Sequence, residues 1–401
     1  MITKVKNCLL RYKWQLFLVF WLANVVLSIV YKFYYYYTGN HLQYTWVSDM
    51  FFLMFLFIAI SKKENKWIFI SIAFLLLCKI IGSTSITSFY QTDFQLYKDV
   101  IKTWMGYVFL FPLFLFLIDN QQQTNQQLVI PSYMQKSFVM VAGGLAISVF
   151  VGLIFKSYVF YTYTGTERFG FSGFIYPFSY VSYFYMLSIP TTYYLHKHLP
   201  KEKMFLVLLY VLVLAAIFAG TKSTYLFLLF FCFLLILDRA LYKNKWFWVT
   251  SVGALVLTLL IHKKILQIFL VLVDLYEKER FWTFALSYRD FKIHNNVIFV
   301  QENWTWANYL FGGLNNSTQL TEMAFVDLFL NFGGLGTILF LYLYYHYILK
   351  RLVFTPFNLA IGVGLLILIG LGGNFFDRVY LAYWLVLYFL TQMKFTSHKH
   401  L

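Results

Sequence analysis

Several Lys and Arg residues stand in the polar segments that separate long apolar runs of this sequence. They are Arg168, Lys222, Arg280, Arg289 and Arg378. An Arg guanidinium binds phosphate through two parallel hydrogen bonds, and a Lys ammonium adds a compact charge. If the fold gathers these side chains at one mouth of a helix bundle, they would bind a polyanionic ligand. The alternative is that each is an interfacial anchor or a solvated loop charge.

Lys222 has a second feature that suits an anion. It lies in the segment Gly-Thr-Lys-Ser-Thr at 220–224, directly before an apolar run long enough to form a helix. The backbone N–H groups in the first turn of a helix have no partner within the helix, and they attract negative charge. We therefore expect the start of this helix to contribute to the same anion site.

Two carboxylates flank the start of another apolar run, at 323–329. Glu322 and Asp327 are five positions apart, which is about 140° around a helix, so the two do not share a face. Asp327 falls inside the run, where an ionisable side chain is costly and is a candidate for function. The alternative for Asp327 is a structural pair with an Arg of a neighbouring helix.

Common catalytic and cofactor motifs are missing. The His and Cys residues have no metal-ligand spacing, and Gly312-Gly313 is neither a dinucleotide-binding motif nor a P-loop. Gly333, Gly334 and Gly336 are more typical of close helix contact than of phosphate binding. The sequence therefore predicts neither a metal site nor a cofactor.

The composition indicates which elements must position these residues. Of the 401 residues, 61% are hydrophobic and only 12% are charged, against roughly 25% charged in soluble domains. A soluble core could not bury so much apolar surface, whereas a bilayer solvates it. The net charge of +16 is explained by cytoplasmic loops rich in Lys and Arg, so we expect no nucleic-acid partner.

The apolar runs are continuous rather than alternating, which predicts an all-α integral membrane protein. Because a span needs about 20 apolar residues, we predict about twelve transmembrane helices within one polytopic membrane domain, 1–401. Their expected positions are 14–31, 46–60, 67–82, 102–118, 138–155, 175–195, 204–219, 224–241, 246–262, 324–348, 357–373 and 379–395.

More than half of the 32 Lys and Arg residues fall on the side of the N-terminus. This bias predicts that both termini are cytoplasmic and that the long loop at about 262–324 is external. Within that loop, Ile265–Leu275 is apolar but too short to cross a membrane. The loop is also rich in aromatic residues, including Trp282, Trp304 and Trp306. We expect it to fold over the membrane surface as a lid.

Several stretches resemble the O-antigen polymerase and O-antigen ligase superfamily. Ala219–Leu226 is similar to its element of small residues, Ser or Thr, and Lys or Arg. The stretch 168–174, followed by Pro177, is similar to an external Arg-Gly-Phe and Pro element. Leu310–Leu314 and then 322–336 resemble its Phe-Gly-x-Gly turn and closing Asn-x-Gly-x-x-Gly. Ser287-Tyr288-Arg289 resembles its Ser-Gly-Arg.

The likeness covers residues 165–390, and one position within it favours the polymerases. Where Glu322 stands, ligases usually have His, whereas polymerases often have an acidic residue. The resemblance implies a GT-C-like glycosyltransferase in the bacterial cytoplasmic (inner) membrane. This enzyme would polymerise polyprenyl-diphosphate-linked oligosaccharide repeat units of a surface polysaccharide, such as a lipopolysaccharide or capsule, on the external face, without a cofactor or an obligatory metal.

The resemblance also implies roles for residues and partners. Glu322 and Arg289 would be catalytic, with Glu322 deprotonating or positioning the attacking sugar hydroxyl. Asp327 is a further candidate. Substrate diphosphate would be bound by Arg168, Lys222, Arg280 and Arg378. The expected partners are the lipid-linked glycans, the bilayer, and the flippase and chain-length regulator of the same pathway.

Two alternatives differ in the fate of the lipid-linked glycan. An O-antigen-type ligase would transfer the finished glycan to another acceptor by the same chemistry. A flippase or another secondary transporter would move it across the membrane. Transporters usually show repeats and charges near the membrane midplane. Here the predicted spans are nearly free of charge and no repeat is found, which favours the glycosyltransferase.

Overall fold

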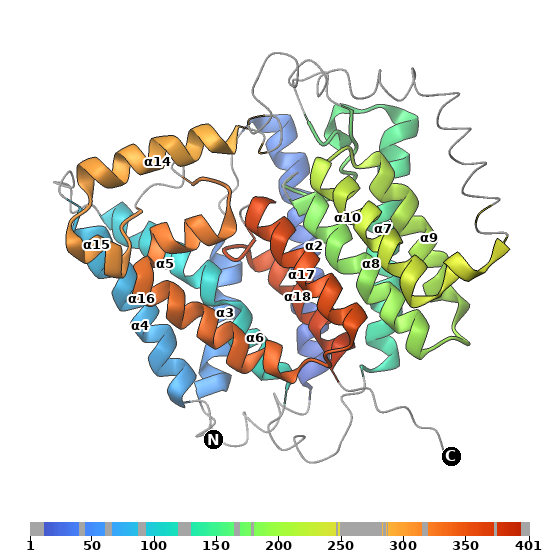
Figure 1. Cartoon of the computed structure of the whole chain (residues 1–401), viewed down its shortest axis with the longest axis horizontal. Helices are drawn as coiled ribbons and strands as arrows, with labels where there is room; N and C mark the ends of the chain where they lie inside the picture. Colours follow the sequence, from blue (N-terminus) through green and yellow to red (C-terminus); the bar gives the residue numbers. More distant parts are fainter. Residues whose placement is uncertain are drawn as a thin grey trace.

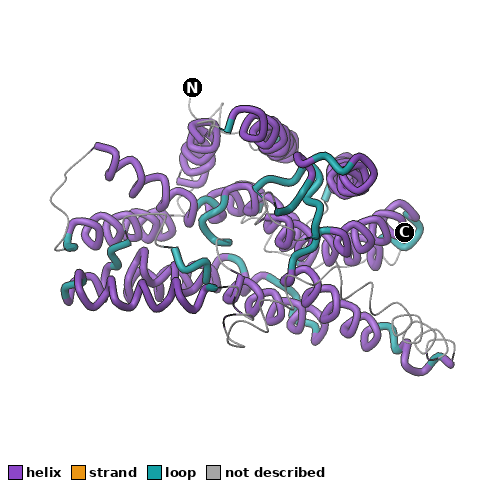
Figure 2. Tube along the Cα trace, turned by 90° about the horizontal axis from the view of Figure 1, so that it is seen from above, coloured by secondary structure: helices purple, strands orange, loops and turns teal. Residues whose placement is uncertain are grey.

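A computed structural model describes most of the chain. The described residues are 12–39, 45–60, 66–86, 94–118, 130–163, 169–177, 180–245, 288–314, 320–372 and 375–393, with the single positions 248, 283 and 286. This part of the chain is helical (Figure 2), and its only extended pairings are two isolated bridges, Tyr161–Phe171 and Leu352–Met393. The predicted all-α class is therefore confirmed for the described residues.

The helices follow the apolar runs closely. In chain order they are α2 (Lys13–Thr38), α3 (Thr45–Ile60), α4 (Lys66–Thr84), α5 (Phe94–Val108), α6 (Leu110–Leu117), α7 (Ser132–Phe155), η3 (Tyr158–Phe160), α8 (Tyr180–His198), α9 (Lys203–Phe218), α10 (Lys222–Asp238), η4 (Leu241–Lys243), α14 (Arg289–Asn303), α15 (Trp306–Phe311), α16 (Ala324–Tyr347), η6 (Leu349–Arg351), α17 (Pro356–Gly372) and α18 (Val379–Gln392).

Five of the described helices are long and apolar enough to cross a membrane. They are Lys13–Thr38, Lys66–Thr84, Lys98–Leu117, Ser132–Phe155 and Ala324–Arg351. Shorter apolar helices accompany them, including Lys203–Phe218 and Val379–Gln392. The chain is thus a membrane protein. Each predicted span overlaps a described helix except 246–262, of which only position 248 is described. The total of twelve stays a prediction.

The helices form two groups, and α18 lies between them (Figure 1). On one side α4 packs against α5, α15 and α16, and on the other α9 packs against α7, α8 and α10. Between them α18 contacts α8 and α6. Nearly every side chain of α8 and α18 is buried. Since both helices are surrounded by protein, they form the core that holds the two groups together.

Aromatic rings fill this core. Trp384 of α18 meets Trp21 of α2 edge-on at 5.2 Å between ring centroids, and Phe184 of α8 at 4.8 Å. Phe138 of α7 lies 6.0 Å away on another side. Edge-to-face pairs of this kind add about 0.5–1.5 kcal/mol each beyond the area they bury. The aromatic richness of the sequence therefore stabilises contacts between helices that are distant in the chain.

Gly333 breaks α16 one-third of the way along its length. Its backbone has φ 64° and ψ −171°, a combination that is essentially restricted to glycine. A Cβ there would lie 2.3 Å from the carbonyl carbon of Leu310 and 2.4 Å from the nitrogen of Gly312. The expected role in close contact is therefore found, but with a break in the helix that the sequence did not indicate. The segment after α15 can consequently lie against α16.

The described part of the predicted lid is helical. In Figure 1, α14 lies across the upper end of the bundle, above α15. Trp304 packs on Tyr309 and on Phe329 of α16, with centroid distances of 5.4 and 5.7 Å. Trp306 is 76% exposed among the described residues, so the protein itself does not cover this ring. Ile265–Leu275 and Trp282 lie outside the described residues.

Candidate functional site

Glu322 forms ion pairs with two cations of α14. Its Oε1 lies 2.5 Å from Lys292 Nζ, and its Oε2 lies 3.7 Å from Arg289 Nη2. Arg289 and Lys292 are three residues apart, which places them on one face of the helix. Arg289 also donates to the carbonyl of Gly372, at the end of α17, at 3.4 Å. The structure therefore brings together the two residues that were predicted to be catalytic, and it adds Lys292.

Asp327 fixes the backbone on which Glu322 stands. Its Oδ1 accepts hydrogen bonds from the Thr321 backbone N–H at 2.7 Å and from the Thr321 hydroxyl at 2.8 Å. Glu322 itself has φ 58°, in the left-handed region that non-glycine residues rarely adopt. Asp327 is 1% exposed, as expected for a residue inside the apolar run. Asp327 thus supports, through Thr321, the backbone that carries Glu322. Among the described residues no Arg is paired with it, so the structural Arg pair considered as the alternative is not found there.

Asp377 and Arg378 form a second charged pair, in the turn between α17 and α18. Arg378 Nε lies 3.1 Å from Asp377 Oδ2, and the guanidinium lies 6.0 Å from the ring centre of Tyr180. The nearby Asp377 and Tyr180 raise the pKa of Arg378 above its already high usual value, so this cation stays charged. The turn packs directly on α5, because a Cβ at Gly106 would lie 2.3 Å from the Asp377 carbonyl oxygen.

Two cavities meet at this pair. One, of about 320 Å³, is lined by Lys79, Asp99, Val100, Lys102, Thr103, Tyr107, Leu314, Leu320, Asn331, Asp377 and Arg378. The other, of about 150 Å³, shares Lys102, Asp377 and Arg378 with the first. Asp377 Oδ1 is buried, and it has no hydrogen-bond partner among the described residues. A carboxylate oxygen is thus available beside the larger cavity.

Tyr183 of α8 links the two charged groups. It lies within electrostatic reach of Arg289, Glu322 and Asp377. A Cβ at Gly372 would come 2.8 Å from its hydroxyl oxygen, and the Gly372 carbonyl is also a partner of Arg289. The Arg289–Lys292–Glu322 group and the Asp377–Arg378 pair therefore belong to one polar region, at the end of the bundle where α16 and α18 begin. We call it the charged site.

The remaining predicted cations have other positions. Lys222 is half-buried at the start of α10, where the preceding Thr221 hydroxyl lies 2.7 Å from Ser182 Oγ of α8. Beside it, Phe171 N–H donates to the Phe218 carbonyl at 2.8 Å. The two motifs that contain Lys222 and Arg168 are thus adjacent in space. Arg168 and Arg280 themselves lie outside the described residues.

Two buried lysines were not predicted as functional residues. Lys79 of α4 donates to the carbonyl of Leu314 and, at 2.6 Å, to Asn331 Oδ1. Lys32 of α2 donates to Ser172 Oγ at 2.7 Å and to the carbonyls of Gly173 and Ile175. The signal was present, because a cation inside an apolar run is a functional candidate. Lys79 falls within the predicted span 67–82.

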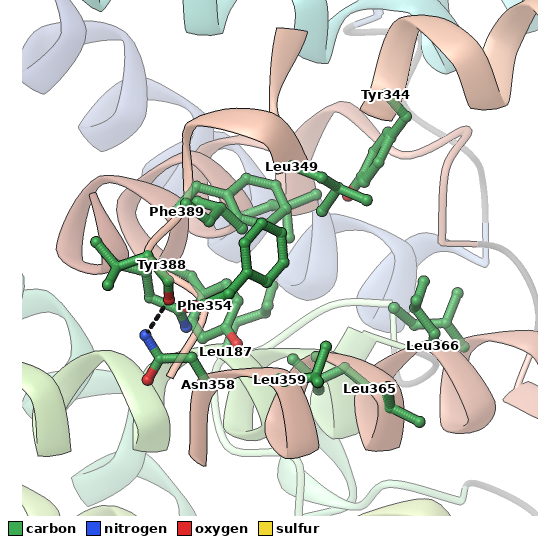
Figure 3. A pocket seen from close by; sticks show the side chains of 17 residues that line it. Leu187, Tyr344, Leu349, Phe354, Asn358, Leu359, Leu365, Leu366, Tyr388 and Phe389 are labelled. Carbon is green, nitrogen blue, oxygen red and sulfur yellow. Dashed lines mark hydrogen bonds between the residues drawn. The ribbon is translucent and has the colours of Figure 1, made fainter. Parts of the chain in front are cut away.

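A third pocket, at the opposite end of α16 and α18, is apolar (Figure 3). Its volume is about 130 Å³, and its walls include Leu187, Tyr344, Phe354 and Leu365. Two side-chain amides line it, those of Asn358 and Gln392. Asn358 Nδ2 donates to the Val353 carbonyl at 2.8 Å, whereas Gln392 Nε2 has no hydrogen-bond partner among the described residues. This pocket offers no charged group for chemistry, so the charged site is the better candidate.

Comparison with known proteins adds no further assignment. No family model, curated protein or solved structure matches the chain. Among the described residues, no group of three His, Cys, Asp or Glu side chains is arranged to hold a metal ion. The function is therefore argued from the geometry of the charged site.

Proposed function

We propose that this protein is an integral membrane glycosyltransferase that polymerises polyprenyl-diphosphate-linked glycan repeat units on the external face of the bacterial cytoplasmic membrane. The observation that carries the proposal is the grouping of Arg289, Lys292 and Arg378 with Glu322 and Asp377 at one end of an apolar helix bundle, beside a cavity. A lipid tail would lie in the bilayer while its charged head reaches these residues.

The chemistry needs a group that stabilises a diphosphate as it leaves. In the reaction, the acceptor hydroxyl oxygen bonds to the anomeric carbon of the donor sugar while the bond to the diphosphate oxygen breaks. The negative charge that develops on the diphosphate would be stabilised by Arg289, Lys292 and Arg378, since fixed cations act strongly in a site that excludes water. The turnover thus yields a longer glycan and a free polyprenyl diphosphate.

A carboxylate must take the proton of the acceptor hydroxyl. Glu322 was the residue expected from the sequence, but each of its oxygens faces a cation. Asp377 keeps Oδ1 without a partner among the described residues and lines both cavities. We therefore propose that Asp377 accepts the proton of the acceptor hydroxyl. Glu322 instead holds Arg289 and Lys292 in place.

The test is polymerisation by purified protein in liposomes that contain the lipid-linked repeat unit. We expect the wild type to produce a ladder of lengthening glycans and Arg289→Ala to lose it almost completely. Arg289→Lys should recover little, because an ammonium does not replace the guanidinium fork. The matched control is Lys201→Ala, an exposed cation at the other end of α8. No ladder from the wild type would refute the proposed polymerase, and a normal ladder from Arg289→Ala would refute the role of the charged site.

The same assay distinguishes the two alternatives. A ligase would transfer one glycan to a different acceptor and produce no ladder, although it would need the same cations. A transporter would move the lipid-linked glycan without releasing polyprenyl diphosphate. We favour an enzyme over a transporter because Lys79 lies five residues from the end of α4, or about 7.5 Å along the helix, close to the charged site rather than at mid-depth.

A further inference from the structure

Lys79 is a buried cation for which the described residues provide no counter-ion. Its side chain is 2% exposed. Its ammonium donates hydrogen bonds to the Leu314 carbonyl and to Asn331 Oδ1. Both acceptors are neutral. The ion pairs found among the described residues are Lys197–Asp238, Arg289–Glu322, Lys292–Glu322 and Arg378–Asp377. A buried charge without a partner is costly.

Asn331 holds this cation in a fixed place. Its Oδ1 accepts from Lys79, while its Nδ2 donates to the Asp327 carbonyl at 2.7 Å. The side chain is 2% exposed, so it has little freedom to turn. An ammonium has three N–H donors, and the described residues accept two of them. One donor is therefore left on the floor of the 320 Å³ cavity, which Lys79 lines.

The rest of the cavity suits a sugar. Tyr107, Thr103 and Asn331 provide hydroxyl and amide groups at its wall, and Val100 and Leu320 provide apolar surface for the C–H face of a pyranose ring. Its volume of about 320 Å³ falls at the lower end of the roughly 300–1,000 Å³ of small-molecule sites. The exposed side chains of Lys102 and Asp99 also line this cavity.

We propose that this cavity binds an acidic sugar of the glycan substrate, with the sugar carboxylate paired to Lys79 on the cavity floor. One ammonium matches the single charge of a uronic acid carboxylate. A diphosphate carries more charge and is better matched by the several cations of the charged site. The inference rests on the proposed function for the identity of the substrate, and it makes Lys79 a residue that determines sugar specificity.

The proposal is tested by binding rather than by turnover. Wild-type protein in lipid nanodiscs is titrated calorimetrically with digalacturonate and with digalactose, which differ in their carboxylates. We expect digalacturonate to bind and digalactose to bind at least about tenfold more weakly, as loss of a charge-assisted hydrogen bond predicts. Lys79→Gln should weaken digalacturonate binding by a similar factor. Equal binding of the two sugars, or no effect of Lys79→Gln, would overturn the proposal.

Two further variants separate binding from folding. Lys32→Gln is the matched control, because Lys32 is also a buried lysine bonded to neutral oxygens but lines neither cavity; it should leave digalacturonate binding unchanged. Asn331→Asp keeps the shape of the side chain and supplies an internal counter-ion to Lys79. It should therefore abolish digalacturonate binding even if Lys79→Gln fails to fold. Retained binding by Asn331→Asp would contradict the pairing.

Inorganic pyrophosphate is the third ligand, and it tests whether the cavity binds a diphosphate instead of an acidic sugar. If pyrophosphate binds in a Lys79-dependent way and digalacturonate does not bind, the cavity belongs to the diphosphate and the proposal is wrong. The proposed function would survive that result, because its test is the glycan ladder lost in Arg289→Ala. Conversely, if digalacturonate binds in a Lys79-dependent way but the wild-type protein makes no glycan ladder, the sugar site is supported and the proposed polymerase function is wrong.

Discussion

Individual residues of the charged site differ in how well a single sequence reveals them. Arg289 and Glu322 were predicted from their residue types and from motifs, and the structure places them in contact. Lys292 and Asp377 were not given roles, because a partnership between residues distant in the chain depends on the fold. The sequence also indicates Lys79 as a functional candidate, because it is a cation within an apolar segment, but it was given no role. Its pairing with Asn331, from another helix, could not be deduced from spacing.

The first prediction concerns the different roles of the Asp377 and Glu322 carboxylates. Asp377→Asn should lower the turnover rate of the reconstituted enzyme about 10²–10⁴-fold, the usual contribution of a general base, with little change in KM. Glu322→Gln should raise KM and lower the rate less, because it releases Arg289 and Lys292 without removing the base. A nearly normal Asp377→Asn beside an inactive Glu322→Gln would reverse the two roles.

At the scale of helices, hydropathy located the apolar elements but not their irregularities. The bounds of α4, α9 and α17 lie close to the predicted spans, because a membrane helix must be apolar along its length. α14 was not predicted as a helix, since its sequence is polar and lies in a loop region. The break at Gly333 was also missed, because glycine is common in membrane helices and the sequence does not show its backbone angles.

The contact between α5 and the Asp377–Arg378 turn gives a prediction for the helices. In Gly106→Ala the new methyl group would lie 2.3 Å from the Asp377 carbonyl oxygen, so the turn must move. We expect a loss of about 1–3 kcal/mol of stability from this overpacking, and a loss of polymerisation larger than the loss of folded protein. Thermal unfolding followed by size-exclusion chromatography measures the first, and the glycan ladder the second.

Gly144→Ala is the matched control for Gly106→Ala. Gly144 is also a helical glycine, in α7, but a Cβ there meets nothing within 4 Å. The substitution should leave activity unchanged and raise stability slightly, because alanine favours a helix by about 0.5–1 kcal/mol over glycine. If both variants retain full activity, the turn does not depend on its contact with α5.

At the scale of the whole molecule, composition predicted a helical membrane protein but not which helices form its core. In a soluble protein, a polar face marks the outside of a helix. In a membrane, lipid-facing and protein-facing surfaces are both apolar, so the pattern that would have distinguished the buried α8 and α18 is weak. Their central place became visible only from packing around Trp384 and its neighbours.

The arrangement of the helices also gathers charge unequally at the two ends of the bundle. Away from the charged site, the ends of α8 and α10 meet through Lys197 and Asp238 at 3.0 Å. The start of α17 joins them, because the ring of Phe357 lies 5.3 Å from that of Tyr193, at a tilt of 47°. The basic segments at 197–203, 239–245 and 350–351 therefore lie at one end. Because Lys and Arg are preferred in cytoplasmic loops, we predict that this end faces the cytoplasm.

The orientation that follows can be checked in intact cells. In a variant without its native cysteines, Cys8, Cys78 and Cys232, we expect Glu302→Cys, on the exposed surface of α14, to react with a membrane-impermeant maleimide added from outside. Lys201→Cys should react only after the cells are opened, because its side chain lies at the basic end. Both sites are exposed in the folded protein, so accessibility alone would label them equally. Labelling of Lys201→Cys in intact cells, with protection of Glu302→Cys, would show that the orientation is the opposite of the predicted one. The charged site would then lie on the side of the membrane where the external glycan cannot reach it.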